Sequence, residues 1–545
     1  MKKIFTLFSI LMLGFLILTG CDEATLPNIS GDIIVTAFKT SFTVKTTFVD
    51  SEAHDLYYGN VRAIVIVECE NDDSKLEEFT RSTITVNKPK VEEPEDGSEA
   101  VIPFEMNGAD VTINSLAAGT EYTLRLVISA SGSQKTIKTV TATTIDNGAS
   151  EEDPILISNL EELIGMNKEN EAYYKLTADI DCEEQTLQTI FNSSTYFKGH
   201  FDGNNHTISN FRIQGNNYAG LFGYMQGATV KDLNLKGVSF VESRGQTYLG
   251  ALAGYAKNCT ISNVQVDGAS FTYTGRTTSE ANIAGFVGEA VNCKISDCNV
   301  SGLVLTISSA QLLVRSGGFV ALNNKSDIDK CFVEGTMKAT ITYNANTNGG
   351  LFIGGFAGIN DSSLGIEDSY AKVDITVTEP ATVTSSGVKT HSLFVGGFVA
   401  ANDHYQLKVT NCVAMGKIDV SALYTYNAYV GGFVGGLDKY EVSRVSNCAY
   451  IPVDTGLTVK FMKEEAADEE TGEVKMDQTA YVSLAIGNIN DKSKEYISNV
   501  IVFKDSISIE NQHSKLVETP YAVGENVSAF SEYIQGIISK LTAAE

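Results

Sequence analysis

The side chains of this chain that could do chemistry are spaced unfavourably for catalysis. Its six histidines form no His-Glu-x-x-His motif, in which two histidines one helical turn apart would bind zinc. Residues 201–450 contain no adjacent pair of aspartates, and the chain has neither a Gly-x-Ser-x-Gly sequence nor a phosphate-binding loop. Asp179 and Asp181 share one face of an expected strand, but we interpret them, like His206, as turn or cap residues. We therefore expect a protein that is not an enzyme and has no metal or cofactor.

Six of the nine cysteines recur at equivalent positions, and the nine are too sparse for a disulfide framework. Four of them share one position relative to a glycine-rich segment, two share another, and none forms a Cys-x-x-Cys pair. Because equivalent positions stack in a repeat protein, we interpret these cysteines as buried thiols that act as small apolar side chains. Disulfides between neighbouring repeats and a metal site remain alternatives. The two sets are Cys298, Cys331, Cys412 and Cys448, and Cys259 and Cys293.

The glycine-rich segments define a repeat. Successive segments are 30, 35, 33, 37, 42 and 35 residues apart, and most continue with Phe-Val or Phe-Ala. A second apolar strand follows each segment, as in Ile295-Ser296-Asp297-Cys298. Seven or eight copies at this period predict a solenoid, in which each repeat buries its apolar side against the next. The segments contain Gly220, Gly250, Gly285, Gly318, Gly355, Gly397 and Gly432.

These repeats, together with residues 197–210, resemble the GLUG motif family over roughly residues 155–505. Such motifs occur in bacterial surface proteins, including non-catalytic regions of IgA-specific metallo-endopeptidases and adhesin-like proteins. The resemblance implies a right-handed parallel β-helix. The residues agree with this fold, because no period of 3.6 residues separates the short apolar strands, which excludes a doubly wound sheet. We expect the phenylalanine after each glycine to point inward and to stack on its neighbour one coil away.

A different pattern precedes the repeats. Residues 32–145 contain several short segments with a period of two, which predicts a half-buried antiparallel sheet folded as a sandwich. Residues 116–124 resemble the tyrosine corner of fibronectin type III modules. The resemblance implies that the ring of Tyr122 is buried and that its hydroxyl satisfies nearby backbone. We interpret this module as a spacer between the membrane and the repeats.

The expected fold class is therefore all-β, with an immunoglobulin- or fibronectin III-like sandwich, a right-handed parallel β-helix and short helical caps. Residues 158–161 read as a capping box that starts a helix, and a second apolar helical face near the C-terminus could shield the last coil. That face consists of Phe530, Ile534, Ile537, Ile538 and Leu541. The expected divisions are a signal peptide (1–20), a tether (21–31), the sandwich (32–145), a linker (146–153), a helical cap with leading strands (154–200), the β-helix (201–510) and a C-terminal helical cap (511–545).

The N-terminus has the features of a lipoprotein signal. Lys2 and Lys3 precede an apolar run of about fifteen residues, which is short for a membrane-spanning helix but suits a signal-peptide core. The run ends in Leu18-Thr19-Gly20-Cys21, which resembles the lipobox of bacterial lipoproteins. The resemblance implies that Cys21 is acylated and anchors the chain in a membrane. We expect a lipid-anchored protein of the cell envelope that is exposed on the cell surface.

The segments between the repeats are the expected binding surface, because insertions in solenoids map to one face. They are rich in Thr, Ser, Asn and Tyr, which could bind a glycan or a protein by stacking and hydrogen bonding. The expected function is adhesion or binding of such a ligand. A polysaccharide lyase or glycoside hydrolase of β-helix fold and a structural stalk are the alternatives. The candidate binding residues are Tyr273, Arg276, Tyr343, Asn346, His391, Tyr424, Tyr426 and Tyr429.

The formal charge of −27 argues against nucleic acid as a partner, because phosphate contacts need clustered Lys and Arg. This charge is unevenly distributed along the chain. Residues 201–450 hold 17 basic and 19 acidic side chains, a net charge of −2, so the flanking parts carry the rest. The near-neutral wall of the expected β-helix favours recognition of polar, uncharged groups over electrostatic capture.

Overall fold

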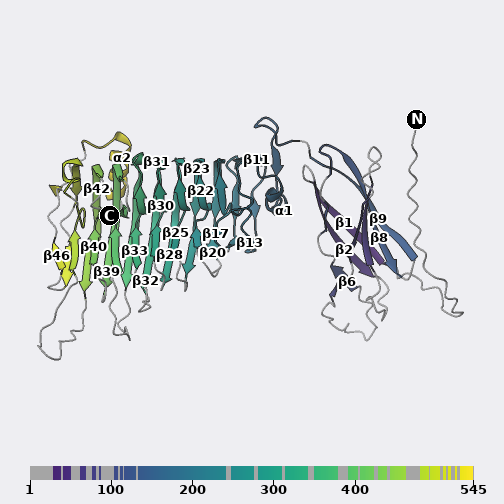
Figure 1. Cartoon of the computed structure of the whole chain (residues 1–545), viewed down its shortest axis with the longest axis horizontal. Helices are drawn as coiled ribbons and strands as arrows, with labels where there is room; N and C mark the ends of the chain where they lie inside the picture. Colours follow the sequence, from purple (N-terminus) through teal and green to yellow (C-terminus); the bar gives the residue numbers. More distant parts are fainter. Residues whose placement is uncertain are drawn as a thin grey trace, which may run out of the picture. The chain divides into compact units, whose positions relative to one another are not determined.

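The computed structural model divides the chain into two compact units, Met1–Asp146 and Asn147–Glu545. Figure 1 shows both units, and each is described by itself. The division falls at the start of the segment that we interpret as a linker. The structure describes residues 29–37, 41–50, 62–68, 77–81, 85–87, 104–107, 111–113, 116–130, 133–145, 147–215, 217–240, 247–274, 280–309, 313–341, 349–378, 391–402, 406–422, 427–437, 442–461, 479–489, 491–503, 507–510, 514–516, 522–523 and 528–543.

Two antiparallel sheets form the first unit, as the period-two pattern predicts. Phe42, Val65 and Tyr122 are buried in the shared core, where the rings of Phe42 and Tyr122 meet edge to face with centroids 5.7 Å apart. The Tyr122 hydroxyl accepts a hydrogen bond from the Ala117 amide at 2.9 Å, which satisfies nearby backbone as expected. One sheet contains β1 (Ile29–Ala37), β2 (Phe42–Asp50), β6 (Phe104–Asn107) and β5 (Thr85–Asn87), with β7 (Val111–Ile113) on β2. The other contains β4 (Glu77–Arg81), β3 (Arg62–Glu68), β8 (Glu121–Ala130) and β9 (Ser133–Thr143).

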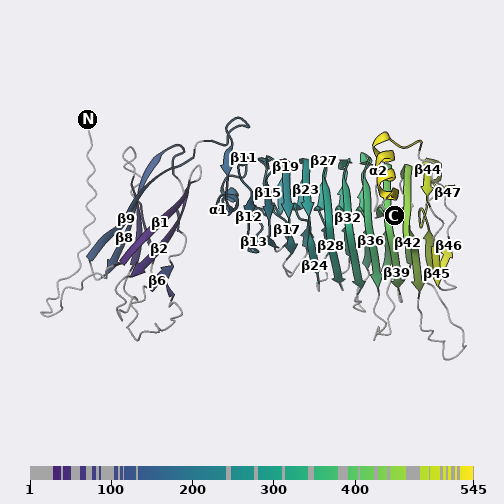
Figure 2. The same cartoon turned by 180° about the vertical axis from the view of Figure 1, so that it is seen from behind.

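The second unit is a parallel β-helix built from three sheets, which run side by side along the unit in Figures 1 and 2. The 22-stranded sheet contains β10 (Ile155–Ile157), β11 (Tyr173–Leu176), β12 (Ile180–Asp181), β13 (Thr186–Gln188), β14 (His200–Asp202), β15 (Thr207–Ser209), β16 (Arg212–Gln214), β19 (Thr229–Lys236), β20 (Ser239–Phe240), β23 (Thr260–Asp267), β24 (Ser270–Tyr273), β27 (Lys294–Ser296), β28 (Asn299–Ser309), β31 (Asp327–Asp329), β32 (Phe332–Ile341), β35 (Gly365–Glu367), β36 (Tyr370–Thr378), β39 (Lys408–Ala422), β42 (Arg444–Phe461), β44 (Ile497–Val502), β45 (Ile507–Glu510) and β47 (Ala522–Val523).

The two smaller sheets lie at the glycine-rich segments. The nine-stranded sheet contains β17 (Tyr218–Ala219), β21 (Thr247–Leu249), β25 (Glu280–Ala284), β29 (Leu313–Gly317), β33 (Gly349–Gly354), β37 (His391–Gly396), β40 (Asn427–Gly431), β43 (Thr479–Ser483) and β46 (Ser514–Leu516). The seven-stranded sheet contains β18 (Tyr224–Gln226), β22 (Ala253–Lys257), β26 (Val287–Val291), β30 (Val320–Asn324), β34 (Ala357–Asp361), β38 (Val399–Ala401) and β41 (Val434–Gly436).

Each repeat makes one coil, because equivalent glycines of successive repeats pair in register. Gly317 lies opposite Gly354, which lies opposite Gly396 in the next coil. The phenylalanine that follows the glycines is fully buried and stacks on its neighbour, as expected, with centroid distances of 4.6 to 5.1 Å. This stack consists of Phe286, Phe319, Phe356, Phe398 and Phe433.

Close approach of the backbones explains the recurring glycine. A Cβ on Gly355 would lie 2.0 Å from the carbonyl oxygen of Gly397, and a Cβ on Gly397 would lie 2.1 Å from that of Gly432. Neither residue has the positive φ that favours glycine. The glycines are therefore required by the packing of one coil on the next.

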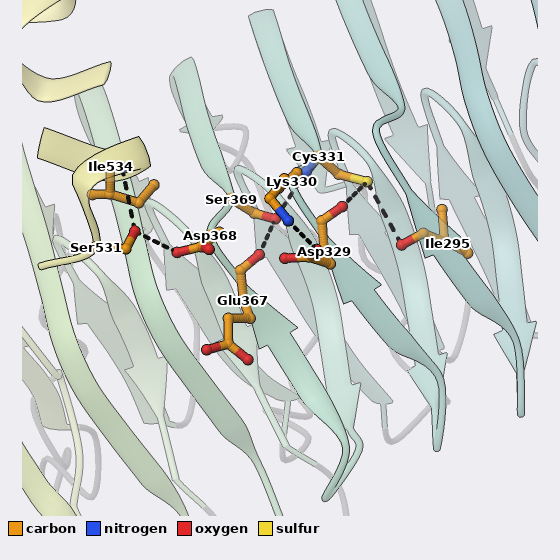
Figure 3. Close-up of polar contacts among 9 residues, drawn as sticks. All are labelled: Ile295, Asp329, Lys330, Cys331, Glu367, Asp368, Ser369, Ser531 and Ile534. Atoms are coloured by element: carbon orange, nitrogen blue, oxygen red, sulfur yellow. Dashed lines mark hydrogen bonds and ion pairs between the residues drawn. The ribbon is translucent and has the colours of Figure 1, made fainter. Parts of the chain in front are cut away.

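The seven described cysteines are free and buried, as we predict for the stacked thiols. The side chain at the position of Cys331 also donates a hydrogen bond to a backbone carbonyl, which the sequence does not reveal. The Cys331 thiol donates to the carbonyl oxygen of Asp329 at 3.2 Å, and Ser369 in the next coil makes the same contact with Glu367 at 2.7 Å (Figure 3). A small side chain with a weak donor suits this position because it satisfies the carbonyl of its own turn.

Two α-helices flank the described strands of the β-helix. Helix α1 (Leu160–Gly165) has Asn159 as its N-cap, with the Glu162 amide donating to Asn159 Oδ1 at 3.1 Å. The Glu162 carboxylate accepts from the Ser158 amide at 2.7 Å, so the expected capping box lies one residue later than predicted. No helix among the described residues is long and apolar enough to cross a membrane.

Helix α2 (Glu532–Ala543) has the predicted apolar face but not the expected place. We expected it to shield the last coil, whereas it packs on the outer face of the large sheet, against residues of β39, β42 and β44 (Figure 2). Ile534 is fully buried there, and Met415 and Ile451 belong to the same apolar cluster. The Ser531 hydroxyl donates to Asp368 Oδ1 at 2.6 Å and accepts from the Ile534 amide at 3.3 Å, which ties the start of the helix to the sheet (Figure 3).

Candidate functional site

The residues that the sequence singles out for binding are only partly placed by the structure. Tyr273 ends β24, and its side chain is fully buried beside Phe271, because both residues face the interior of the sheet. The prediction that Tyr273 contacts a ligand is therefore wrong. Tyr429 lies in β40 with a half-buried side chain. Cys21, Arg276, Tyr343, Asn346, Tyr424, Tyr426 and the side chain of His391 lie outside the described residues.

Tyr429 belongs to a row of aromatic rings on the outer face of the nine-stranded sheet. Phe352, Phe394, Tyr429 and Tyr481 follow one another in register on successive strands. Neighbouring rings stack with centroids 4.8, 4.7 and 5.2 Å apart and are nearly parallel. Because the rings cover one another's faces, this row presents mainly ring edges to the surface.

The row of rings is part of a longer ladder, by which we mean the residues that pair in register on successive strands of this sheet. Toward the start of the β-helix the ladder consists first of polar and then of aromatic residues. Phe352 is preceded in register by Arg315, Asn282, Tyr248 and Tyr218. The residues next to these along each strand, such as Leu249 and Ile283, are buried, so strand alternation places the ladder on the outside.

A parallel ladder on the seven-stranded sheet meets this one. Tyr224, Tyr255 and Glu289 pair in register on β18, β22 and β26. The chain bends after the glycine-rich segments, so outer residues of the two sheets contact each other. Tyr218 and Tyr224 meet edge to face with centroids 4.9 Å apart.

Four tyrosines gather where the two ladders meet, and we call Tyr218, Tyr224, Tyr248 and Tyr255 the tyrosine cluster. Tyr218 stacks on Tyr248 at 5.0 Å and Tyr224 stacks on Tyr255 at 4.6 Å. Tyr248 and Tyr255 lie edge to face at 6.1 Å. All four side chains are half-buried, so the cluster combines a packed aromatic body with partly accessible hydroxyls.

A chain of polar contacts continues from the cluster into the next two coils, and we call Glu280, Asn282, Glu289 and Arg315 the Glu289 network. The Asn282 amide nitrogen donates to Glu289 Oε2 at 3.1 Å. The Arg315 Nη1 atom donates to Asn282 Oδ1 at 3.2 Å and to Glu280 Oε2 at 2.9 Å. Asn282 and Arg315 are buried, whereas Glu280 is half-exposed.

Burial dominates the electrostatics of Glu289. It is the largest of the causes that together raise the pKa of this carboxyl to about 7, and the neighbouring Glu280 charge acts in the same direction. The Arg315 guanidinium and the Asn282 hydrogen bond act in the opposite direction. Burial also raises the pKa values of Tyr218, Tyr224 and Tyr255, and the charge of Glu289 contributes to each of these shifts.

Sequence reasoning missed this site because it searched the variable segments between coils. A signal was present in the repeats themselves. Tyr218 and Tyr248 both stand two residues before the recurring glycines Gly220 and Gly250. Equivalent positions stack in a solenoid, so a recurring tyrosine at an outward position predicts an aromatic row on the surface.

The remaining titratable candidates have structural roles. Asp179 accepts a hydrogen bond from the Thr207 amide at 2.9 Å and lies 3.1 Å from His206 Nδ1. Asp181 accepts from the Glu183 amide at 2.9 Å, a contact within one turn. These contacts fit the interpretation of Asp179, Asp181 and His206 as turn residues. Within the described ranges, no group of three or more His, Cys, Asp or Glu side chains is placed to hold a metal ion.

Two hollows lie away from the tyrosine cluster. One, of about 70 Å³, is lined by Tyr173, His200 and Lys231, and the Tyr173 and His200 rings stack with centroids 4.1 Å apart. The other, of about 480 Å³, lies near the end of α2, where Lys372 and Leu541 are among the lining residues. Neither hollow brings together groups with an evident chemical task.

Comparison with known proteins links the start of the β-helix to a protease family. Residues 149–268 match the family described as the M26 IgA1-specific metallo-endopeptidase N-terminal region, and this segment contains the whole tyrosine cluster. An immunoglobulin A1 protease of Streptococcus pneumoniae is 30% identical over 229 residues, which cover 40% of this chain and 11% of that protein. A second, from Streptococcus pneumoniae strain R6, is 28% identical over 242 residues. The chain thus spans about a tenth of the length of the curated relatives it matches.

Solved structures with related architecture are distant in sequence. A putative immunoglobulin A1 protease from Bacteroides ovatus is 17% identical, with 64% of this chain and 86% of that chain covered and a TM-score of 0.30. A structure named IgA1 Protease is 14% identical, with 78% and 29% covered and a TM-score of 0.29. A catalytic domain of a GH87 α-1,3-glucanase is 11% identical, with 91% and 99% covered and a TM-score of 0.21.

The sequence matches correct the expectation that the protein is not an enzyme. The matched family is the N-terminal region of a metallo-endopeptidase, and three curated relatives are named immunoglobulin A1 protease. These are the names of proteins that share the matched segment with this chain. The expectation rested on missing sequence motifs, which cannot exclude activity from groups that the fold brings together.

Proposed function

We propose that this chain is a lipid-anchored protein of the bacterial surface whose β-helix recognises a protein, with immunoglobulin A1 as the first candidate. The lipobox-like sequence that ends at Cys21 supports the anchor. The name of the curated relatives supports the choice of candidate, since it states the protein on which those relatives act. We further infer that recognition serves proteolysis of the bound protein.

The tyrosine cluster is the observation that carries the proposal. Tyrosine is enriched at protein interfaces, because a ring with few rotatable bonds buries a large area while its hydroxyl bonds to polar groups. Tyr218, Tyr224, Tyr248 and Tyr255 offer such a surface within the segment matched to the M26 N-terminal region.

The geometry of the rings favours a protein over a glycan. A sugar ring stacks on the open face of an aromatic side chain. In the tyrosine cluster the faces are turned toward one another, since Tyr218 stacks on Tyr248 and Tyr224 stacks on Tyr255. The hydroxyls and ring edges that remain suit the amides, carbonyls and side chains of a polypeptide.

Binding of immunoglobulin A1 to the purified full-length chain in detergent tests the proposal. The double variant Tyr224→Ala with Tyr255→Ala is expected to weaken binding at least about tenfold, because it removes two central aromatic contacts. Tyr173→Ala is the matched control, since Tyr173 is a half-buried ring that stacks on His200 outside the cluster. Surface plasmon resonance measures the affinities, with immunoglobulin G as the comparison ligand. Loss of binding in the control alone, or no binding by the unmodified chain, would overturn the proposal.

Proteolysis is followed in the same mixtures by gel electrophoresis of immunoglobulin A1, and new fragments are expected. Tight binding without any fragment would retain the recognition surface and refute the proteolytic part of the proposal.

A further inference from the structure

We propose that the ligand of the tyrosine cluster places a basic side chain, lysine or arginine, against the Glu289 carboxylate. This inference rests on the proposed function and adds the chemical class of the group that the site contacts. It follows from the partners of Glu289, from the rings around it and from the charge of the network.

Among the described contacts, the direct ion pair of Arg315 is made with Glu280 rather than with Glu289. Arg315 Nη1 donates to Glu280 Oε2 at 2.9 Å and to Asn282 Oδ1 at 3.2 Å. Among the described contacts, the Glu289 carboxylate receives its hydrogen bond from the neutral amide of Asn282. One guanidinium therefore stands against two carboxylates, so the network carries a net charge of −1 when Glu289 is ionised.

Tyrosine rings lie close to the same carboxylate. Tyr255 lies opposite Glu289 in register on the neighbouring strand, and the rings of Tyr224 and Tyr218 contact Tyr255 with centroids 4.6 and 5.9 Å away. The charge of Glu289 accordingly contributes to the raised pKa values of all three phenols. A cation is attracted to the carboxylate and can donate hydrogen bonds to the phenol oxygens, which remain accessible while the ring faces cover one another. An acidic group of the ligand would be repelled by Glu280 and Glu289.

The attraction of a cation to Glu289 is local, because residues 201–450 have a net charge of only −2. We therefore expect the site to recognise one basic side chain at a defined position of the ligand, and not a ligand with a high overall positive charge. A single basic side chain beside the cluster would be held by Glu289, while neighbouring uncharged groups contact the tyrosines. The site would thus recognise a single basic side chain within an otherwise uncharged polar segment.

The preference has a characteristic dependence on pH. The groups that face Glu289 are Tyr218, Tyr224, Tyr255, Glu280 and Arg315, together with the neutral Asn282. With the pKa of Glu289 at about 7, the carboxyl is mostly protonated at pH 6 and mostly ionised at pH 8. The raised pKa values keep the tyrosines neutral throughout. A basic group binds the ionised form, so its affinity rises by up to about tenfold in total between pH 6 and pH 8.

An array of synthetic peptides that differ in one central residue, Lys, Arg, Gln or Glu, tests the inference with the full-length chain. We compare the unmodified chain with Glu289→Gln, which keeps the side-chain shape, and with Glu367→Gln as a control that removes an equal charge from β35. Circular dichroism verifies that each variant is folded. The Lys and Arg peptides are expected to bind the unmodified chain and the control several-fold more tightly at pH 8 than at pH 6.

Glu289→Gln is expected to lose both the preference for basic peptides and its pH dependence. Equal binding of the Lys and Gln peptides by the unmodified chain at pH 8, or an unchanged preference in Glu289→Gln, overturns the inference. The peptide array does not depend on immunoglobulin A1. If immunoglobulin A1 does not bind but the array shows a preference for basic peptides, the proposed partner is refuted. The inference that Glu289 recognises a basic side chain is then retained.

Discussion

At the scale of single residues, the Glu289 carboxyl is placed where ionisation works against the folded state. Its environment includes tyrosine rings and a neutral amide, and its burial among them costs the carboxylate more solvation than Arg315 restores. The folded-state pKa of about 7 lies above the ordinary value of 4.5, so the folded chain binds the proton more tightly than the unfolded chain. Stability therefore falls as the pH rises from about 4.5 to about 7, and the loss is complete above that range.

Glu289→Gln is accordingly expected to stabilise the second unit at high pH. The neutral amide keeps the contacts of the protonated acid and removes the cost of ionisation, a gain of about 1 to 3 kcal/mol at pH 8. The thermal midpoints of the variant and the unmodified chain are compared at pH 8 and at pH 4, which lies below the range of the shift, so that the gain should vanish there. A variant that is less stable than the unmodified chain at pH 8 would contradict the electrostatic argument.

The residues that could be predicted are those whose role repeats along the chain. Cys331 and Phe356 recur at equivalent positions, and their burial follows from stacking. Glu289 occurs once, and nothing in its neighbours along the chain marks it. Its environment comes from Tyr255, one coil before, and from Asn282 on the adjoining sheet, which become neighbours only through the register of the coils.

At the scale of elements, α2 shows the difference between predicting a helix and predicting its place. The apolar face that includes Phe530 and Ile534 identifies the helix in the sequence. Its partner is a patch of outward apolar residues such as Met415 and Ile451, which a period-two pattern cannot separate from core residues. The sheet is apolar on both sides at this point, so it needs a cover on its outer face.

Ile534→Ala is expected to loosen α2 while the coils stay folded. The side chain is fully buried, and its removal costs about 2 to 5 kcal/mol of docking energy. Hydrogen exchange is expected to become faster in residues 532–543 and to change little in β32 and β28. Lys540→Ala on the exposed side of the helix is the control and should exchange like the unmodified chain. Uniform acceleration across all coils would mean that the helix is required for the β-helix itself.

At the scale of the whole chain, the β-helix has an inside that the repeat dictates and an outside that varies from coil to coil. The recurring glycine and phenylalanine set the register, so the one-coil repeat and the internal stack could be derived from the sequence. On the outer ladder, Tyr248 gives way to Asn282, Arg315 and Phe352 without any period. The proposed recognition surface therefore lies on the outside, where the sequence pattern says least.

This division predicts unequal effects for two phenylalanines of the same coil. Phe356 lies in the internal stack between Phe319 and Phe398, so Phe356→Ala leaves a cavity that costs about 3 to 5 kcal/mol. Phe352 lies four residues earlier in the half-buried outer row, so Phe352→Ala should cost about 1 to 2 kcal/mol. Because each coil contacts mainly its neighbours, the internal cavity should also uncouple the coils on its two sides. Urea unfolding followed by hydrogen exchange is expected to show one transition for Phe352→Ala and two for Phe356→Ala. Equal destabilisation by the two variants would refute the distinction between an inside that holds the coils together and an outside that is free to vary.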